Sequence, residues 1–114
     1  MRRLTIALAA TAMLSPVSAQ QLSAETDQAM WCATAIALLD AMGVYPDSAP
    51  DAIALSRLWL QPAFREFDRL GLSEDAVAAL VSSYNDELSM QLPNYLVSSD
   101  PDALRLDINA CIET

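Results

Sequence analysis

The fold is decided by the stretch Met30-Trp31-Cys32-Ala33-Thr34-Ala35-Ile36-Ala37-Leu38-Leu39-Asp40-Ala41-Met42-Gly43, the most apolar segment after the first 20 residues. Its many alanines favour a helix, which we expect to begin after a Ser23 N-cap and to end before Gly43. Apolar side chains surround this helix with no clean polar face, so we predict that it is buried in the middle of the domain. A strip of small residues, Ala33, Ala37 and Ala41, should let another helix approach closely.

The chain before this helix has the features of a secretory signal peptide. Arg2 and Arg3 precede a short apolar segment, Leu4 to Leu14, and Val17-Ser18-Ala19 supplies the small residues that a signal peptidase requires. The apolar segment is too short to span a membrane. We therefore predict that residues 1–19 are cleaved and that residues 20–114 form one helical domain in the periplasm of a bacterium or outside the cell.

The two cysteines of the chain are Cys32 and Cys111. In an oxidising compartment a disulfide between them is the expected state, and it would join the first helix to the C-terminal segment. A redox-active pair is the less favoured interpretation, because the cysteines lie far apart and no C-x-x-C motif is present.

Three further helical segments follow, so we predict an all-α fold, a small four- to five-helix bundle closed by one disulfide between its N- and C-terminal parts. One segment runs from about Pro50 to Leu70, with a kink or a break at Pro62. The next begins after Ser73, and Pro93 should stop any helix that runs through residues 88–97. Asp100-Pro101 should open the last helix.

The charge of the chain is strongly acidic, with fifteen acidic residues, six arginines and no lysine. Without Arg2 and Arg3, four arginines remain and the net charge at neutral pH is −11. Such a charge repels nucleic acids and anionic membrane surfaces and speeds docking onto basic proteins. We therefore expect no nucleic-acid partner, no stable membrane anchor after cleavage, and a protein partner that is cationic.

Several classes of catalytic and metal site lack the residues they need. The chain has no histidine, which excludes Ser-His-Asp catalysis and histidine metal ligands, and only two glycines, which are too few for a phosphate-binding loop. We predict no catalytic residues, no metal site and no cofactor, and a protein that is not an enzyme. The weaker alternative is a carboxylate-based hydrolase, which would need two acids facing one pocket.

Some residues are candidates for binding or sensing. Asp40 is a lone charge in the apolar stretch, and the favoured interpretation is a carboxylate that is solvated or paired with an arginine. The less favoured one is a buried acid that senses pH. Aromatic side chains near Pro62 and apolar side chains near Pro93 either belong to the core or form a contact surface for a partner. These possible partner-binding residues are Trp59, Phe64, Met90, Leu92, Tyr95 and Leu96.

The function predicted from these observations is protein binding, as an accessory subunit or as an inhibitor or immunity-type binder of a cationic partner. The alternative is an acid-stress chaperone. Trp31-Cys32 near the start of the secreted chain and one long-range disulfide make it broadly similar to the small periplasmic acid-stress chaperones in size, compartment and cysteine use, without an aligned motif. Acid would neutralise fifteen carboxylates and leave four arginines charged, which could loosen the domain and expose apolar segments.

Overall fold

A computed structural model describes residues 22–113 of the chain, and the regular structure in this range is entirely helical. The elements are α2 (Ala24–Ala41), α3 (Ala52–Leu70), α4 (Glu74–Ser98), the short 3₁₀ helix η2 (Pro101–Ala103) and α5 (Ile108–Ile112). The predicted all-helical fold class is therefore confirmed for the described residues. The predicted signal peptide, residues 1–19, lies outside them, as do residues 20, 21 and 114.

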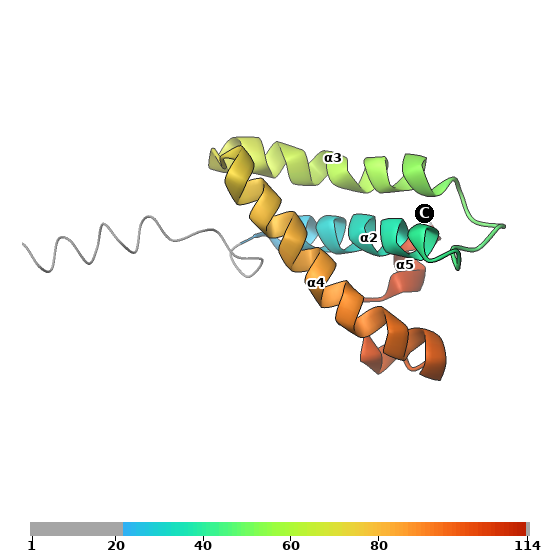
Figure 1. The fold of residues 1–114 in the computed structure, drawn as a ribbon. Helices are drawn as coiled ribbons and strands as arrows, with labels where there is room; N and C mark the ends of the chain where they lie inside the picture. The colour runs from blue at the N-terminus through green and yellow to red at the C-terminus, as the bar shows by residue number, and fades with distance from the viewer. Residues whose placement is uncertain (1–21, 114) are drawn as a thin grey trace, which may run out of the picture.

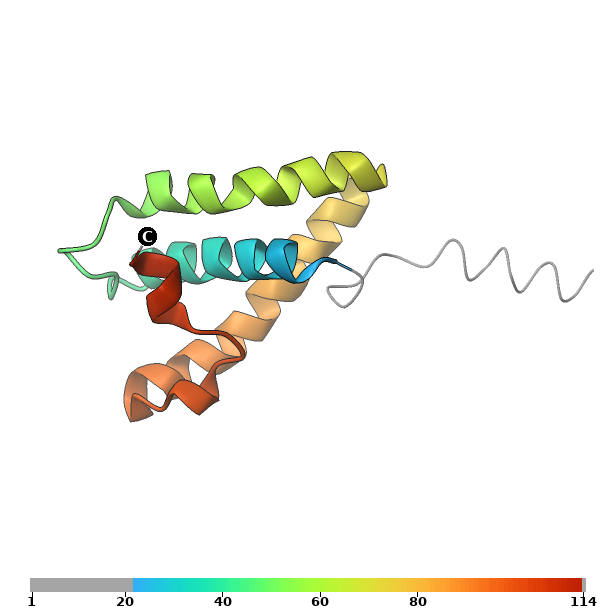
Figure 2. The same cartoon turned by 180° about the vertical axis from the view of Figure 1, so that it is seen from behind.

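The central element is α2, on which the other helices pack. α3 lies alongside α2, α4 crosses it on one side, and α5 packs on it from the opposite side (Figures 1 and 2). Met30, Trp31, Cys32 and Ile36 in the middle of α2 are at most 1% exposed. The prediction that this helix is buried by its neighbours is confirmed for the middle of α2, whereas Ala37 and Ala41 near its C-terminal end are exposed.

The helix ends follow from local chemistry. The Ser23 hydroxyl accepts a hydrogen bond from the backbone N–H of Thr26, and Ser73 caps α4 through Ala76 in the same way. Gly43 and Gly71 adopt positive φ angles after α2 and α3, a conformation that glycine adopts without steric cost. These predicted boundaries are confirmed, and α3 begins slightly later than Pro50, after an Asp51 N-cap.

The two internal prolines do not interrupt their helices. α3 continues through Pro62 and α4 continues through Pro93. Of the kink or break predicted at Pro62, the break is therefore wrong, and so is the stop predicted at Pro93. Each proline removes one backbone hydrogen bond, to the carbonyl four residues earlier. Leu58 and Ser89 carry these carbonyls, and both residues are exposed. Water can therefore hydrate the freed carbonyl groups, which makes the loss tolerable.

The C-terminal segment differs from the single helix that we predicted. Pro101 opens only η2, Leu104 is extended, and Asp107 caps the separate helix α5. The reason is local, because the side chains of Asp100 and Asp107 each accept a hydrogen bond from a backbone N–H two residues later, which favours turns over a continuous helix.

The predicted disulfide is present and joins Cys32 in α2 to Cys111 in α5, 79 residues apart. Both cysteines are fully buried, so the bond passes through the core. A disulfide is consistent with an extracellular or periplasmic location. Within residues 22–113, the helices are all too short or too polar to cross a bilayer.

Candidate protein-binding groove

An apolar groove of about 450 Å³ lies over α2, between α3 and α4. Its floor contains the alanine strip of α2, its walls carry Leu60 and Phe64 from α3 and Val81 from α4, and few polar atoms line it. The lining residues are Met30, Ala33, Thr34, Ala37, Leu38, Ala41, Ser56, Leu60, Phe64, Val81 and Asn85.

The groove exists because the close packing around α2 ends before the helix does. Ala33 is buried, whereas Ala37 and Ala41 are exposed at the C-terminal end of the same strip. Alanine side chains let a neighbouring helix come near, since the distance between packed helix axes depends on the side chains at the contact. Within the described residues no helix covers this end of the strip, so a feature suited to close helix packing faces solvent.

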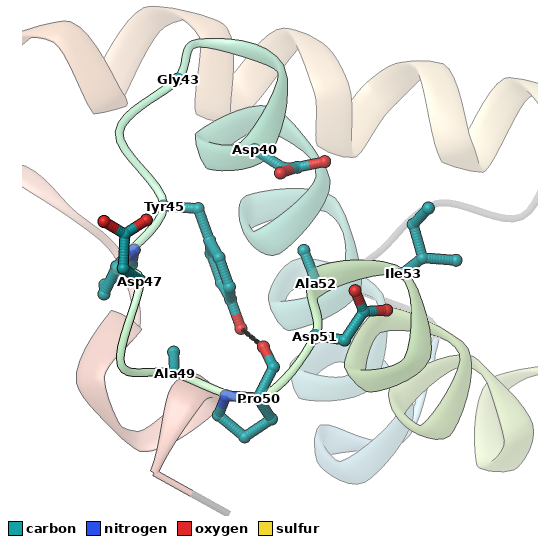
Figure 3. A pocket seen from close by; sticks show the side chains of 10 residues that line it. Asp40, Gly43, Tyr45, Asp47, Ala49, Pro50, Asp51, Ala52 and Ile53 are labelled. Carbon is teal, nitrogen blue, oxygen red and sulfur yellow. Dashed lines mark hydrogen bonds between the residues drawn. The ribbon is translucent and has the colours of Figure 1, made fainter.

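Acidic side chains lie beyond both ends of the groove. At one end, Asp40, Asp47 and Asp51 surround the ring of Tyr45 in a hollow of about 350 Å³, in which the Tyr45 hydroxyl donates a hydrogen bond to the carbonyl of Pro50 (Figure 3). Burial raises the pKa of Tyr45, and the charges of Asp51 and Asp40 raise it further.

At the other end, a second hollow shares Phe64 with the groove and is lined by Asp68 and Glu74. The basic residues nearest to the groove in sequence are Arg57 and Arg65, which follow the lining residues Ser56 and Phe64 in α3. Acidic groups therefore outnumber basic ones around the groove.

The candidate contact residues do not form one surface. Phe64 is 51% exposed and lines the groove, as a contact residue should. Met90 and Leu96 are 77% and 39% exposed on the C-terminal half of α4, and neither lines the groove. Trp59 is half-buried, and its indole Nε1 donates a hydrogen bond of 2.9 Å to the carbonyl of Cys111, so it holds α5 against α3.

The predictions for two site residues, Leu92 and Asp40, need correction. Leu92 is fully buried because α4 continues through Pro93 and turns this side chain into the core, so it cannot contact a partner. Tyr95, one turn further, is half-buried against the same core. Asp40 is exposed near the end of α2, so the interpretation as a buried pH-sensing acid is wrong, and its alternative, a solvated carboxylate, is correct.

Sequence reasoning missed Leu60 and Val81 as groove residues, and the alanine strip and Phe64 were the two signals that pointed to this face. The alanine strip lies on α2, and the walls of the groove belong to α3 and α4. The periodicity of one helix does not show how the three helices are arranged.

A charged cluster forms away from the groove, where the C-terminal segment meets α2 and α4. Arg105 makes ion pairs of 2.6 Å with both Asp27 of α2 and Glu87 of α4, and the Tyr84 hydroxyl donates a 2.7 Å hydrogen bond to Asp27. We call these four residues the Arg105 cluster.

The cluster shifts the pKa of its members. Partial burial acts to raise the pKa of Asp27, but hydrogen bonds from Arg105 and Tyr84 outweigh this effect and lower it. Hydrogen bonds to Asp27 and Glu87 raise the pKa of Arg105, while burial and the bond to Asp27 raise that of Tyr84. The arrangement therefore favours a charged Asp27 in the folded protein.

A second carboxylate ties α3 to the start of α2. Glu66 accepts hydrogen bonds from the backbone N–H and the hydroxyl of Ser23 and forms a 3.0 Å ion pair with Arg69. The bond from the Ser23 backbone is the main reason that the pKa of Glu66 is lowered. Folding therefore favours the charged form of two carboxylates near the beginning of α2.

The described residues contain no group of three or more Cys, Asp and Glu side chains placed to hold a metal ion. Comparison with known protein families, curated proteins and solved structures finds no match to this chain. The function must therefore be inferred from the groove, the charges and the packing of its own residues.

Proposed function

We propose that this chain is a small secreted or periplasmic protein that has no catalytic activity and acts by binding another protein, as an accessory subunit or as an inhibitor or immunity-type binder. The single observation that carries the proposal is the groove, where an apolar face of the central helix is open to solvent. Exposed apolar surface of this kind is typical of contact sites. The groove is built from three helices, and a disulfide fixes α2 to α5. This rigidity favours a binding site that is already formed before the partner binds.

The charge of the domain supports a basic partner. Residues 20–114 contain fifteen acidic residues and four arginines, and two of these arginines, Arg69 and Arg105, form ion pairs with carboxylates. A net charge of −11 draws cationic proteins towards the domain and repels other acidic ones. Because this attraction acts through solvent, we expect partner capture to become slower as the salt concentration rises.

Site-specific photo-crosslinking in the native host tests this proposal. A photoreactive phenylalanine analogue at Ala37, on the groove floor, should form one dominant protein adduct, and the purified pair should associate more slowly in salt. The same analogue at Leu58, which is 60% exposed and does not line the groove, is the matched control. Equal adducts from both positions, or no adduct from Ala37, would contradict binding at this groove.

The second candidate function is an acid-responsive chaperone, and the Arg105 cluster is the observation that favours it. The cluster connects the C-terminal segment to α2 and α4, and it does so through carboxylates that acid neutralises. Its loss would free the segment next to Leu104, which is buried, and so expose part of the core.

We expect the stability of the domain to fall in acid, and Arg105→Met to remove part of this dependence. Because the folded-state pKa values of Asp27 and Glu66 lie below their unfolded values, their contribution is complete above about pH 5 and is lost as the pH falls through the folded values. At pH 7 the variant should lose about 1–2 kcal/mol, since the two ion pairs are partly exposed. Urea denaturation at a series of pH values between 7 and 2 measures both effects.

The matched control is Arg65→Met, because Arg65 is exposed and makes no ion pair within the described residues. It should leave both the stability at pH 7 and its pH dependence close to those of the wild type. If Arg105→Met left the slope of stability against pH below 5 unchanged, the cluster would not be the acid-sensitive element. If the wild type bound no hydrophobic dye at pH 2–3, the chaperone function would be excluded.

A further inference from the structure

We infer that the groove receives a single amphipathic helix of the partner, with large apolar side chains along one face and basic side chains beside them. This inference rests on the proposed function and specifies the chemistry of its partner. It follows from the shape of the groove, from the residues that line it and from the charges at its two ends.

The shape of the groove fits a helix. α2 forms the floor and α3, which lies alongside it, forms one wall, whereas α4 crosses α2 and contributes Val81 and Asn85 to the second wall (Figure 1). The floor extends from Met30 to Ala41, which corresponds to about 17 Å of helix and therefore to about three turns of a helix laid along it.

The lining residues select large apolar side chains. The floor carries the small side chains of Ala37 and Ala41, whereas the walls carry the larger side chains of Leu60, Phe64 and Val81. Side chains at positions i, i+4 and i+7 of a helix form a ridge that can enter such a space, as helices commonly do when they bind apolar grooves. A ridge of leucines or phenylalanines would fill the volume above the alanines, whereas a ridge of alanines would leave it empty.

The acidic residues at the two ends of the groove favour a partner helix that carries basic side chains. Asp40 and Asp51 lie beyond one end of the groove, and Asp68 and Glu74 lie beyond the other. Two arginines, Arg57 and Arg65, follow groove residues in the sequence, so the acidic groups still outnumber the basic ones. A helix with lysine or arginine beside its apolar ridge would place positive charges near both acidic ends. A second copy of this chain is disfavoured as the occupant, because each copy carries the same acidic groups and the same large negative charge.

Binding of a synthetic peptide by the oxidised protein tests the inference. The probe is a fluorescent peptide of about 18 residues, with leucines at i, i+4, i+7 and i+11 and with lysine and alanine elsewhere. One control peptide has the same composition with its leucines dispersed so that no ridge forms, and another carries glutamate in place of lysine. Fluorescence anisotropy should show at least about tenfold weaker binding for each control.

Variants of the protein then locate the peptide. Ala37→Trp fills the floor of the groove and should weaken binding at least about tenfold, whereas Leu58→Trp, which introduces the same side chain outside the groove, should change it less than about twofold. Asp40→Asn with Asp68→Asn should reduce both the affinity and its salt dependence. The pair Asp102→Asn and Glu113→Gln changes the total charge equally, away from the groove, and should have a smaller effect.

The results distinguish a failure of this inference from a failure of the proposed protein-binding function. Equal binding of the ridged and dispersed peptides, or unchanged binding by Ala37→Trp, would overturn the inference, and so would a dimer in sedimentation that Ala37→Trp dissociates. If the crosslink at Ala37 forms but the ridged peptide does not bind, the protein-binding function stands and the helical occupant is wrong. If the peptide binds at Ala37 but no crosslink forms in the host, the groove chemistry stands and the proposed function is wrong.

Discussion

Replacement of both Cys32 and Cys111 by alanine is expected to lower the free energy of unfolding by about 4–5 kcal/mol. The disulfide closes a loop across a separation of 79 residues, and a long loop restricts the unfolded chain strongly. Domains of this size have a total stability of roughly 5–14 kcal/mol, so the variant should be close to the limit of folding. Urea denaturation followed by circular dichroism measures the change.

Reduction provides the control for this prediction. A reducing agent should destabilise the wild type by a similar amount and should leave the double alanine variant unchanged, because the variant has no disulfide to lose. A double variant within about 1 kcal/mol of the wild type would show that packing of the helices, rather than the covalent bond, maintains the fold.

Replacement of Trp31 by alanine is expected to cost about 3–5 kcal/mol. Trp31 lies in the middle of α2 and has 0% of its surface exposed, so its removal leaves a large cavity at the centre of the domain. The surrounding helices can close such a cavity only in part, since α2 is also fixed by the disulfide at the next residue. Thermal and urea denaturation of the variant test the prediction.

Trp31→Phe is the matched variant, because it keeps a ring and removes the indole N–H. That N–H is buried and has no hydrogen-bond acceptor among residues 22–113, and an unpaired buried donor costs about 1–3 kcal/mol. Its removal should offset part of the lost packing, and we expect Trp31→Phe to cost no more than about 1–2 kcal/mol. A loss as large as that of Trp31→Ala would mean that the N–H contributes a stabilising interaction.

The elements that could be predicted from the sequence are those whose signals are local. Ser23, Gly43, Gly71 and Ser73 mark helix ends because a side-chain oxygen or a positive φ angle acts within a few residues. The burial of α2 also follows from its own composition, since a helix without a polar face must be covered on several sides. The pairing of two cysteines in an oxidised chain needs no knowledge of the structure.

The errors arose where a local signal was weaker than the packing around it. Leu80, Tyr84 and Leu88 form a buried row with a spacing of four residues, and Leu92 is the next member of that row. A proline that stops the helix would place Leu92 outside this row, which is why the sequence alone also allows a contact surface at Leu92. Continued burial of the row offsets the loss of one solvated hydrogen bond, and the helix continues to Ser98.

The candidate site was predictable only in part, because it is assembled from three helices. The alanine strip was visible in the sequence, and so was the exposed aromatic residue Phe64. Their position beside Val81 depends on the angle at which α4 crosses α2 (Figure 1). That angle is set by how side chains of both helices interlock, which no single segment of the sequence encodes.

Because α2 is central and comes early in the chain, it is synthesised well before some of the elements that cover it. α2 is the first of the described helices to be synthesised, but the cysteine that bonds to it follows 79 residues later. At about 5–20 residues per second, roughly 4–16 seconds separate the two cysteines during translation. During that interval α2 lacks α5, the last of the described elements that cover it. The disulfide between Cys32 and Cys111 can therefore form only after Cys111 has been synthesised, and until then α2 packs without the covalent link to α5.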